Sequence, residues 1–133
     1  MGLKIEGRDA DKPTAKDVAR RDAPTCSLDE QVGEARRRAQ EAGMDLCVVV
    51  NSEGIVLGLL RDSELESEGD AGAEKAMRAG PSTFRPHVPI AEMAKYMVEH
   101  DLESTLITTS EGKLTGVLFR QDAVDATHEQ HEH

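Results

Sequence analysis

Apolar residues recur with helical spacing in two stretches of the chain. In the first stretch, residues 32–42, they fall on one face of a helix, and Gly43 follows at a position where helices commonly end. Ser27 or Asp29 is expected to cap the start of this helix. The second stretch has the same spacing and begins after Pro89, a residue that suits the first helical position. The predicted apolar faces consist of Val32, Ala35, Ala39 and Ala42 in the first helix and of Ile90, Met93, Ala94, Met97 and Val98 in the second.

Each predicted helix is followed by two apolar segments with the composition of β-strands. Residues 46–50 and 55–60 flank a turn that contains Ser-Glu-Gly, and residues 104–108 and 113–119 flank the same tripeptide. This arrangement predicts two β-hairpins. Shorter elements complete the pattern: amphipathic segments at 14–21 and 72–79, extended pieces at Thr25-Cys26 and Thr83-Phe84, and polar helices with the sequences RDSELE (61–66) and RQDAVDA (120–126).

These elements form an internal repeat with an offset of 58 residues. A repeat of this length determines the overall architecture of a chain. The offset pairs Ser52-Glu53-Gly54 with Ser110-Glu111-Gly112, Gly58 with Gly116, Thr25 with Thr83, and Arg20 with Arg78. The predicted fold class is α/β, with two β-α-β-β-α repeats at 14–65 and 72–125 and a linker at 66–71. The remaining residues are expected to be a flexible N-terminal tail (1–13) and a His/Glu-rich C-terminal tail (126–133). Because a unit of about fifty residues buries too little surface alone, the two repeats are expected to pack together.

Charge, apolar content and cysteine count exclude several classes of function. The chain carries 16 Lys and Arg against 26 Asp and Glu, a formal charge of −10. This charge repels phosphate backbones and anionic lipid, so neither a nucleic-acid polymer nor a membrane surface is an expected partner. No apolar run approaches the roughly 18 residues that a membrane span needs. Two cysteines, Cys26 and Cys47, are too few to staple the fold and suit a reducing compartment, so a cytoplasmic location is expected.

The two hairpin ends resemble those of CBS (cystathionine beta-synthase) domains, and the tandem repeat resembles the pair called a Bateman module. The residues that carry the resemblance are Gly58-Leu59-Leu60-Arg61-Asp62-Ser63-Glu64-Leu65 and Gly116-Val117-Leu118-Phe119-Arg120-Gln121-Asp122-Ala123. The resemblance implies two sheets packed as a pseudo-twofold pair with two clefts between the repeats. It further implies that the clefts bind an adenosine-containing ligand such as AMP, ADP, ATP or S-adenosylmethionine, and that two modules form a homodimer.

The family motif implies a role for two positions after each glycine. A hydroxyl three residues on meets phosphate, and an aspartate six residues on accepts hydrogen bonds from ribose. In this chain Arg61 and Phe119 occupy the hydroxyl position, while Glu64 and Asp122 occupy the aspartate position. Arg61 offers a charge-assisted phosphate contact in place of the hydroxyl, whereas Phe119 offers no donor.

The resemblance also places threonines of the first strand of each repeat, and one further arginine, beside the clefts. The candidate ligand-binding residues are therefore Thr25, Arg61, Glu64, Thr83, Arg120 and Asp122. Each has a structural alternative. An acid at a helix start is favoured by the helix dipole, and a β-branched threonine suits a strand without any ligand.

No arrangement typical of catalysis or of a resident cofactor occurs in the sequence. The resemblance to CBS domains therefore implies a regulatory, non-enzymatic, ligand-sensing module that acts on an unidentified protein partner. One alternative is a ligand-free dimerisation scaffold. A third, a metal-dependent hydrolase built on His128, His131 and His133, is less favoured because no second shell is evident. The homodimer is expected to form through apolar helix faces that include Val32, Ala39, Ile90, Met93 and Met97.

Overall fold

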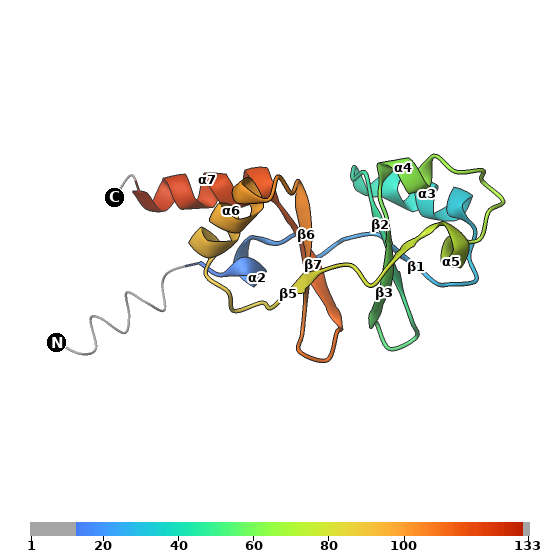
Figure 1. Ribbon diagram of the computed structural model, residues 1–133, viewed down its shortest axis with the longest axis horizontal. Coiled ribbons are helices and arrows are strands. Elements are labelled where there is room, and N and C mark those ends of the chain that lie inside the picture. The colour runs from blue at the N-terminus through green and yellow to red at the C-terminus, as the bar shows by residue number, and fades with distance from the viewer. Residues whose placement is uncertain (1–12, 132–133) are drawn as a thin grey trace.

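The computed structural model describes residues 13–131, with side chains for residues 13–127. It contains two sheets, each with helices on its outer face (Figure 1). The elements of the first repeat are α2 (Ala15–Val18), β1 (Thr25–Cys26), α3 (Val32–Ala42), β2 (Cys47–Val50), β3 (Val56–Leu60) and α4 (Asp62–Leu65). Those of the second are α5 (Ala73–Ala76), β4 (Arg78–Ala79), β5 (Thr83–Phe84), α6 (Ile90–Glu99), β6 (Ser104–Thr108), β7 (Leu114–Phe119) and α7 (Arg120–His131).

The two sheets confirm the predicted α/β class. The repeat also holds for the register of the strands. The first sheet has the order β1-β2-β3-β4 and the second the order β5-β6-β7. In each sheet the short first strand runs parallel to the next strand, and the hairpin that follows is antiparallel. Thr25 lies opposite Val48 and Thr83 opposite Leu106, which are the same pairs displaced by the repeat offset.

The inner faces of the two sheets pack against each other and form one of three apolar clusters. Its buried members are Leu46, Val48, Leu59, Leu106 and Val117. A second cluster lies under α3 and a third under α6, so each sheet is buried on both faces. Both free cysteines, Cys26 and Cys47, are buried under α3 as small apolar residues.

Helix α3 buries the face predicted from its spacing, and Gly43 ends it in the left-handed conformation (φ +70°) that glycine adopts without strain. The predicted cap was wrong, because Gln31 is the N-cap residue and its side chain makes no capping hydrogen bond. Ser27 instead closes the preceding turn: its N–H donates to Glu30 at 2.9 Å.

The apolar helix faces offered above as a dimer surface belong to the chain's own core. Val32, Ala39, Ile90, Met93 and Met97 are each at most 2% exposed. The prediction that these residues form a homodimer interface is therefore wrong in its choice of residues. The predicted faces are buried, but the chain's own sheets cover them. Val98 is the exception: the spacing placed it on the apolar face of α6, and it is 57% exposed.

Helix α7 runs to His131 and so continues past residue 125, where the sequence placed the end of the second repeat. Expectations for residues 1–12 and 132–133 lie outside the described residues, as do those for the side chains of His128 and His131.

The leading segment of each repeat packs on the sheet of the other repeat, an exchange that the sequence did not predict. Ala15 of α2 is buried in the cluster under α6, and the Arg20 and Val117 backbones exchange hydrogen bonds of 2.8 and 2.9 Å. Conversely, Ala73 of α5 is buried in the cluster under α3, and β4 extends the first sheet by pairing with β3. We refer to residues 14–24 and 72–82 as the crossover segments.

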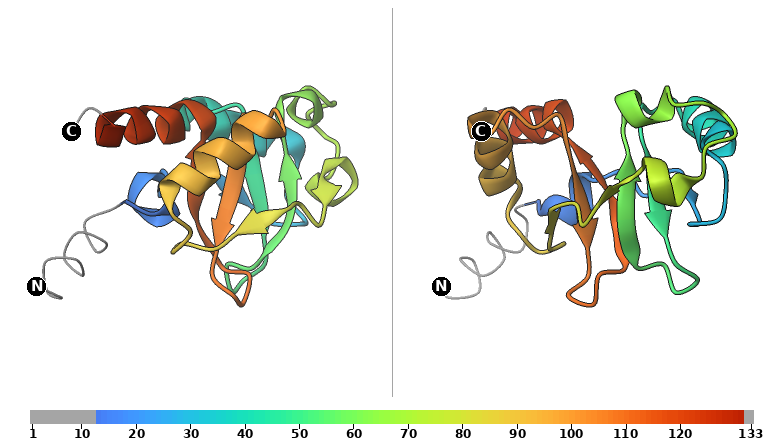
Figure 2. Two further views of the ribbon diagram at one scale, coloured as in Figure 1. Left: turned by 60° about the vertical axis from the view of Figure 1, so that its left-hand side comes forward. Right: turned by 45° about the vertical axis from the view of Figure 1, so that its right-hand side comes forward.

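The two hairpins point in the same direction (Figure 2), and backbone hydrogen bonds beside their turns also join the sheets. The Val56 N–H donates to the Gly112 carbonyl at 2.9 Å, and the Leu114 N–H donates to the Gly54 carbonyl at 3.0 Å. Both glycines have positive φ angles, +83° and +92°, which these tight turns require. The repeats are thus connected at the hairpin tips as well as through the inter-sheet core and the crossover segments.

Thr108 provides a test of the packing, because its hydroxyl is buried with no hydrogen-bond partner among the described residues. Replacing it with valine keeps the shape and removes the unpaired polar group. We expect Thr108→Val to raise the free energy of unfolding by about 1 kcal/mol, measured by urea denaturation. Thr105→Val is the control and should give no gain, because the Thr105 hydroxyl contacts the Met97 sulfur at 3.9 Å. A less stable Thr108→Val variant would contradict the assignment.

Candidate functional site

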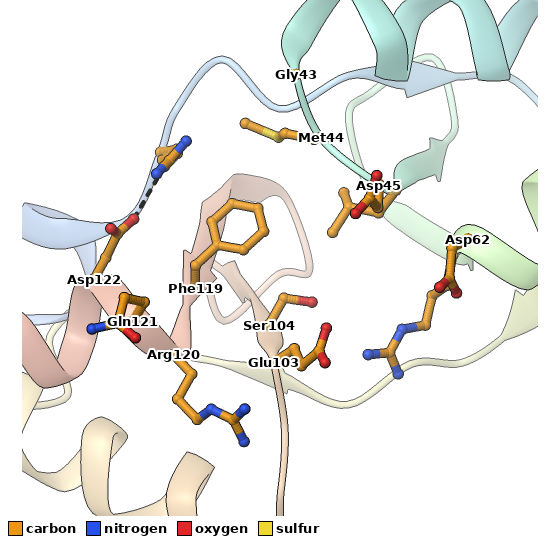
Figure 3. A pocket seen from close by; sticks show the side chains of 13 residues that line it. Gly43, Met44, Asp45, Asp62, Glu103, Ser104, Phe119, Arg120, Gln121 and Asp122 are labelled. Carbon is orange, nitrogen blue, oxygen red and sulfur yellow. Dashed lines mark hydrogen bonds and ion pairs between the residues drawn. The ribbon is translucent and has the colours of Figure 1, made fainter.

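Two clefts open between the repeats, at positions related by the repeat offset. We call the first the Asp122 cleft. It has a volume of about 480 Å³, and its lining includes Arg20, Met44, Leu46, Arg61, Phe119 and Asp122. Figure 3 shows the Phe119 ring beside Met44 and Ser104, so side chains from both repeats meet in this space.

We call the second the Arg78 cleft. It has a volume of about 530 Å³, and its lining includes Arg61, Arg78, Tyr96, His100, Leu102 and Ser104. Arg78, Leu102 and Ser104 are the counterparts of Arg20, Met44 and Leu46 in the Asp122 cleft. The two clefts therefore have the same construction. In each, a crossover segment forms one wall and the start of a central strand forms another.

Asp122 lies in the first turn of α7, directly after β7, and it faces the Asp122 cleft. Its Oδ2 accepts a hydrogen bond from Arg20 Nε at 3.0 Å, which is the dashed line in Figure 3. The same guanidinium lies over the Phe119 ring at 5.0 Å from the centroid, a favourable cation–π geometry. Because Arg20 belongs to the first repeat and Asp122 to the second, this ion pair connects the repeats.

Glu64 makes the matching contact in the first repeat. Its Oε2 accepts from Arg78 Nε at 3.0 Å and from the Ser63 hydroxyl at 2.8 Å, and its Oε1 accepts from the Arg61 N–H at 2.9 Å. Burial alone would raise the pKa of the Glu64 carboxyl, but the hydrogen bonds from Arg61, Ser63 and Arg78 together hold that pKa below its usual value. Glu64 is therefore an ionised acceptor at neutral pH.

The glycine of each hairpin motif allows a crossover segment to lie against the strand. A Cβ at Gly116 would lie 2.7 Å from the Arg20 carbonyl oxygen, and a Cβ at Gly58 would lie 3.0 Å from the Arg78 carbonyl oxygen and closer still to Met77. Any side chain at either position would push the arginine-bearing segment away from the strand. The motif glycine and the arginine–carboxylate pair are thus parts of one arrangement.

The arginines differ in their partners. Arg61 lines both clefts, and no described residue accepts a hydrogen bond from its guanidinium or pairs with it. Arg120 lines the Asp122 cleft but pairs with Asp101 at 3.0 Å. Of the two, Arg61 is the guanidinium left available to an anion.

The two candidate threonines lie outside the linings of both clefts. The Thr25 carbonyl accepts a hydrogen bond from Arg38 Nη1 at 2.8 Å, and the Thr83 hydroxyl accepts one from Arg85 Nη2 at 2.6 Å. Ser82 and Phe84, which flank Thr83 in the sequence, do line the Arg78 cleft. The structure thus brings Arg61, Glu64, Arg120 and Asp122 to the clefts or their ion pairs and leaves Thr25 and Thr83 aside.

Sequence reasoning missed the crossover arginines as site residues. Arg20 and Arg78 are identical residues at equivalent positions of the two repeats, which is the signal that marks them. Their identity alone does not reveal a role in the site, because each arginine is far in sequence from the carboxylate that it contacts.

Within residues 13–127, whose side chains the structure describes, no group of three or more metal-ligating side chains comes together. None of the helices in the described part of the chain combines the length and apolar character that a membrane span requires.

Gly116→Ala tests the close approach of the first crossover segment. The added methyl group would meet the Arg20 carbonyl, so the segment must move and the Arg20–Asp122 pair must lengthen. We expect a loss of about 1–3 kcal/mol in the free energy of unfolding. Gly72→Ala is the control, because a Cβ at Gly72 meets no atom within 4 Å, and it should change stability by less than about 0.5 kcal/mol. Equal stabilities for the two variants would contradict the packing described here.

Comparisons with known proteins agree with this architecture. The chain is 28% identical over 103 residues to an inosine-5'-monophosphate dehydrogenase of Korarchaeum cryptofilum, and the match covers 77% of this chain but only 22% of that enzyme. Among solved structures, CBSX2 in complex with AMP has a TM-score of 0.76 at 18% identity, covering 89% of this chain and 98% of the other. The cytosolic domain of the Mg2+ channel MgtE in complex with ATP has a TM-score of 0.76 at 19% identity, covering 85% and 48%.

The family is shown by the sequence itself. The family model described as CBS domain matches residues 15–68 and again residues 73–129, which together span most of the chain. The two matches coincide with the two halves of the structural repeat. The chain therefore belongs to the CBS domain family and carries two CBS domains in tandem.

Proposed function

We propose that this CBS pair is a regulatory, non-catalytic module that binds an adenosine-containing nucleotide in the clefts between its repeats. The observation that carries the proposal is the matched pair of clefts, each lined by an arginine of one repeat that pairs with a carboxylate at a helix start of the other. Asp122 belongs to the lining of its cleft, whereas Glu64 contacts Arg78 from outside the lining. A carboxylate accepts from a ribose diol, and a guanidinium binds phosphate. The AMP and ATP complexes belong to CBSX2 and MgtE, and they support the same ligand class for this chain.

The ion pairs suggest how binding would be transmitted. A ribose diol that takes the place of Arg20 on Asp122, or of Arg78 on Glu64, would release the guanidinium to the ligand's phosphate. Each arginine belongs to a crossover segment, so the exchange would change how that segment is held on the opposite sheet. Binding then shifts the population of arrangements between the repeats, and a partner protein or a second copy of the module would sense that shift.

The two clefts are unequal, so we infer that they differ in ligand preference. Four carboxylates line the Asp122 cleft: Asp45, Asp62, Glu103 and Asp122. No carboxylate is among the described residues that line the Arg78 cleft, which contains Arg61 and Arg78. Phosphorylated ligands should therefore prefer the Arg78 cleft, whereas uncharged adenosine or S-adenosylmethionine should prefer the Asp122 cleft.

The existing ion pairs also favour a second candidate, a ligand-free interaction scaffold. Asp122 and Glu64 are already paired with arginines, so neither carboxylate needs a ligand as its partner. In that case the arginine–carboxylate pairs would serve only to hold the crossover segments. Ligand binding distinguishes the two candidates.

Calorimetric titration with AMP, ATP and S-adenosylmethionine tests the proposal. We expect wild type to bind AMP, and Arg61→Gln to weaken AMP binding by about tenfold or more through loss of a charged hydrogen-bond donor. Asp122→Asn should weaken S-adenosylmethionine more than AMP.

Arg37→Gln is the matched control, because Arg37 is exposed on α3, pairs with Glu41 and lines neither cleft. Its affinities should equal those of wild type. If wild type bound none of the three compounds, the scaffold function would replace the proposed one.

A further inference from the structure

Three rings form a continuous row on one side of the Arg78 cleft. The Phe84 and Tyr96 rings meet edge to face with centroids 5.1 Å apart, and the Tyr96 and His100 rings are tilted with centroids 4.1 Å apart. Tyr96 and His100 are one helical turn apart at the end of α6, and all three rings line the cleft. We call Phe84, Tyr96 and His100 the ring row.

The ring row is anchored to the core but is not fully buried. Phe84 packs on the apolar cluster under α6, and Met97, next to Tyr96, is fully buried, so the backbone that carries the rings is held in place. Tyr96 nevertheless remains 38% exposed. Among the described large apolar residues, only Tyr96 and Val98 are this exposed, and of these two only Tyr96 lines a cleft.

The same cleft also holds cationic groups. The guanidinium groups of Arg61 and Arg78 belong to its lining, no described carboxylate does, and the chain as a whole carries a charge of −10. A planar ring is attracted to stacked aromatic side chains, and a phosphate group is attracted to arginine. A volume of about 530 Å³ accommodates a ligand that has both groups.

From this geometry we propose that the ring row is a stacking subsite for the base of a phosphorylated, purine-type ligand, whose phosphate group contacts Arg61 and Arg78. The inference deepens the proposed function and rests on it, because it assigns the ligand class and the base contact of one cleft. It does not extend to the Asp122 cleft. There a single ring, Phe119, is already covered by the Arg20 guanidinium, and four carboxylates line the space.

The chain supplies its own probe, since it contains one tyrosine and no tryptophan. Intrinsic emission therefore reports Tyr96 alone. Titration of the whole chain with AMP should quench this emission, because the base would stack on the ring. Ribose 5-phosphate, which has the sugar and the phosphate but no base, should bind more weakly and leave the emission unchanged.

Substitutions at Tyr96 separate stacking from general damage, with calorimetry as the readout. Tyr96→Leu should weaken AMP binding by about tenfold and leave ribose 5-phosphate binding unchanged, whereas Tyr96→Phe should retain wild-type affinity for both. Val98→Ala, on the same helix but outside the clefts, is the control and should match wild type.

Three other outcomes would overturn the inference. AMP binding that Tyr96→Leu leaves unchanged would place the base elsewhere and leave the proposed function standing. Equal losses for AMP and ribose 5-phosphate would mean that the substitution distorts the phosphate site. Absence of AMP binding by wild type would overturn the inference, and absence of ATP and S-adenosylmethionine binding as well would refute the proposed function itself.

Discussion

The structure depends on the exchange of leading segments between the repeats. Each small sheet is completed by residues from the other half of the chain: Ala15 fills the core under α6, and β4 adds a strand beside β3. A sheet of two or three short strands with one helix buries too little surface to be stable alone, and the exchange adds apolar contact to both halves. It also brings an arginine of each half to a carboxylate of the other.

The clefts follow from this exchange. The motif glycines allow each crossover segment to lie against the opposite strand. The arginine of the segment then lies beside the first turn of the helix that follows that strand. The same plan is used twice, but the side chains differ: Phe119 and Arg61 occupy equivalent positions, as do Leu46 and Ser104. One cleft consequently has four carboxylates and three arginines around a ring that an arginine already covers, whereas the other has two arginines, three rings and no described carboxylate. Two sites that arose from one repeat have thereby become chemically distinct.

Much of the fold was predictable because the repeat and the local patterns agree. The spacing of Ile90, Met93 and Met97 predicted α6, and the glycine-containing turns predicted both hairpins. The dimer surface was misassigned because an amphipathic pattern shows that a face is buried without showing what covers it. The exchange of segments was not predictable either, since residues 14–24 fit either sheet by composition alone. The family motif identified Glu64 and Asp122, whereas their partners Arg78 and Arg20 became evident only when the chain was folded.

The central claim is that the two repeats are interleaved. Each half of the chain carries its own probe of unfolding. Tyr96 reports the second repeat by its emission, while the buried thiols of Cys26 and Cys47 report the first by their reaction with a thiol reagent. Urea unfolding followed by both probes is the most direct test. The account predicts one cooperative transition with coincident midpoints, because neither sheet is complete without the other half. Two separate transitions, in which thiol reactivity and Tyr96 emission change at different urea concentrations, would contradict it.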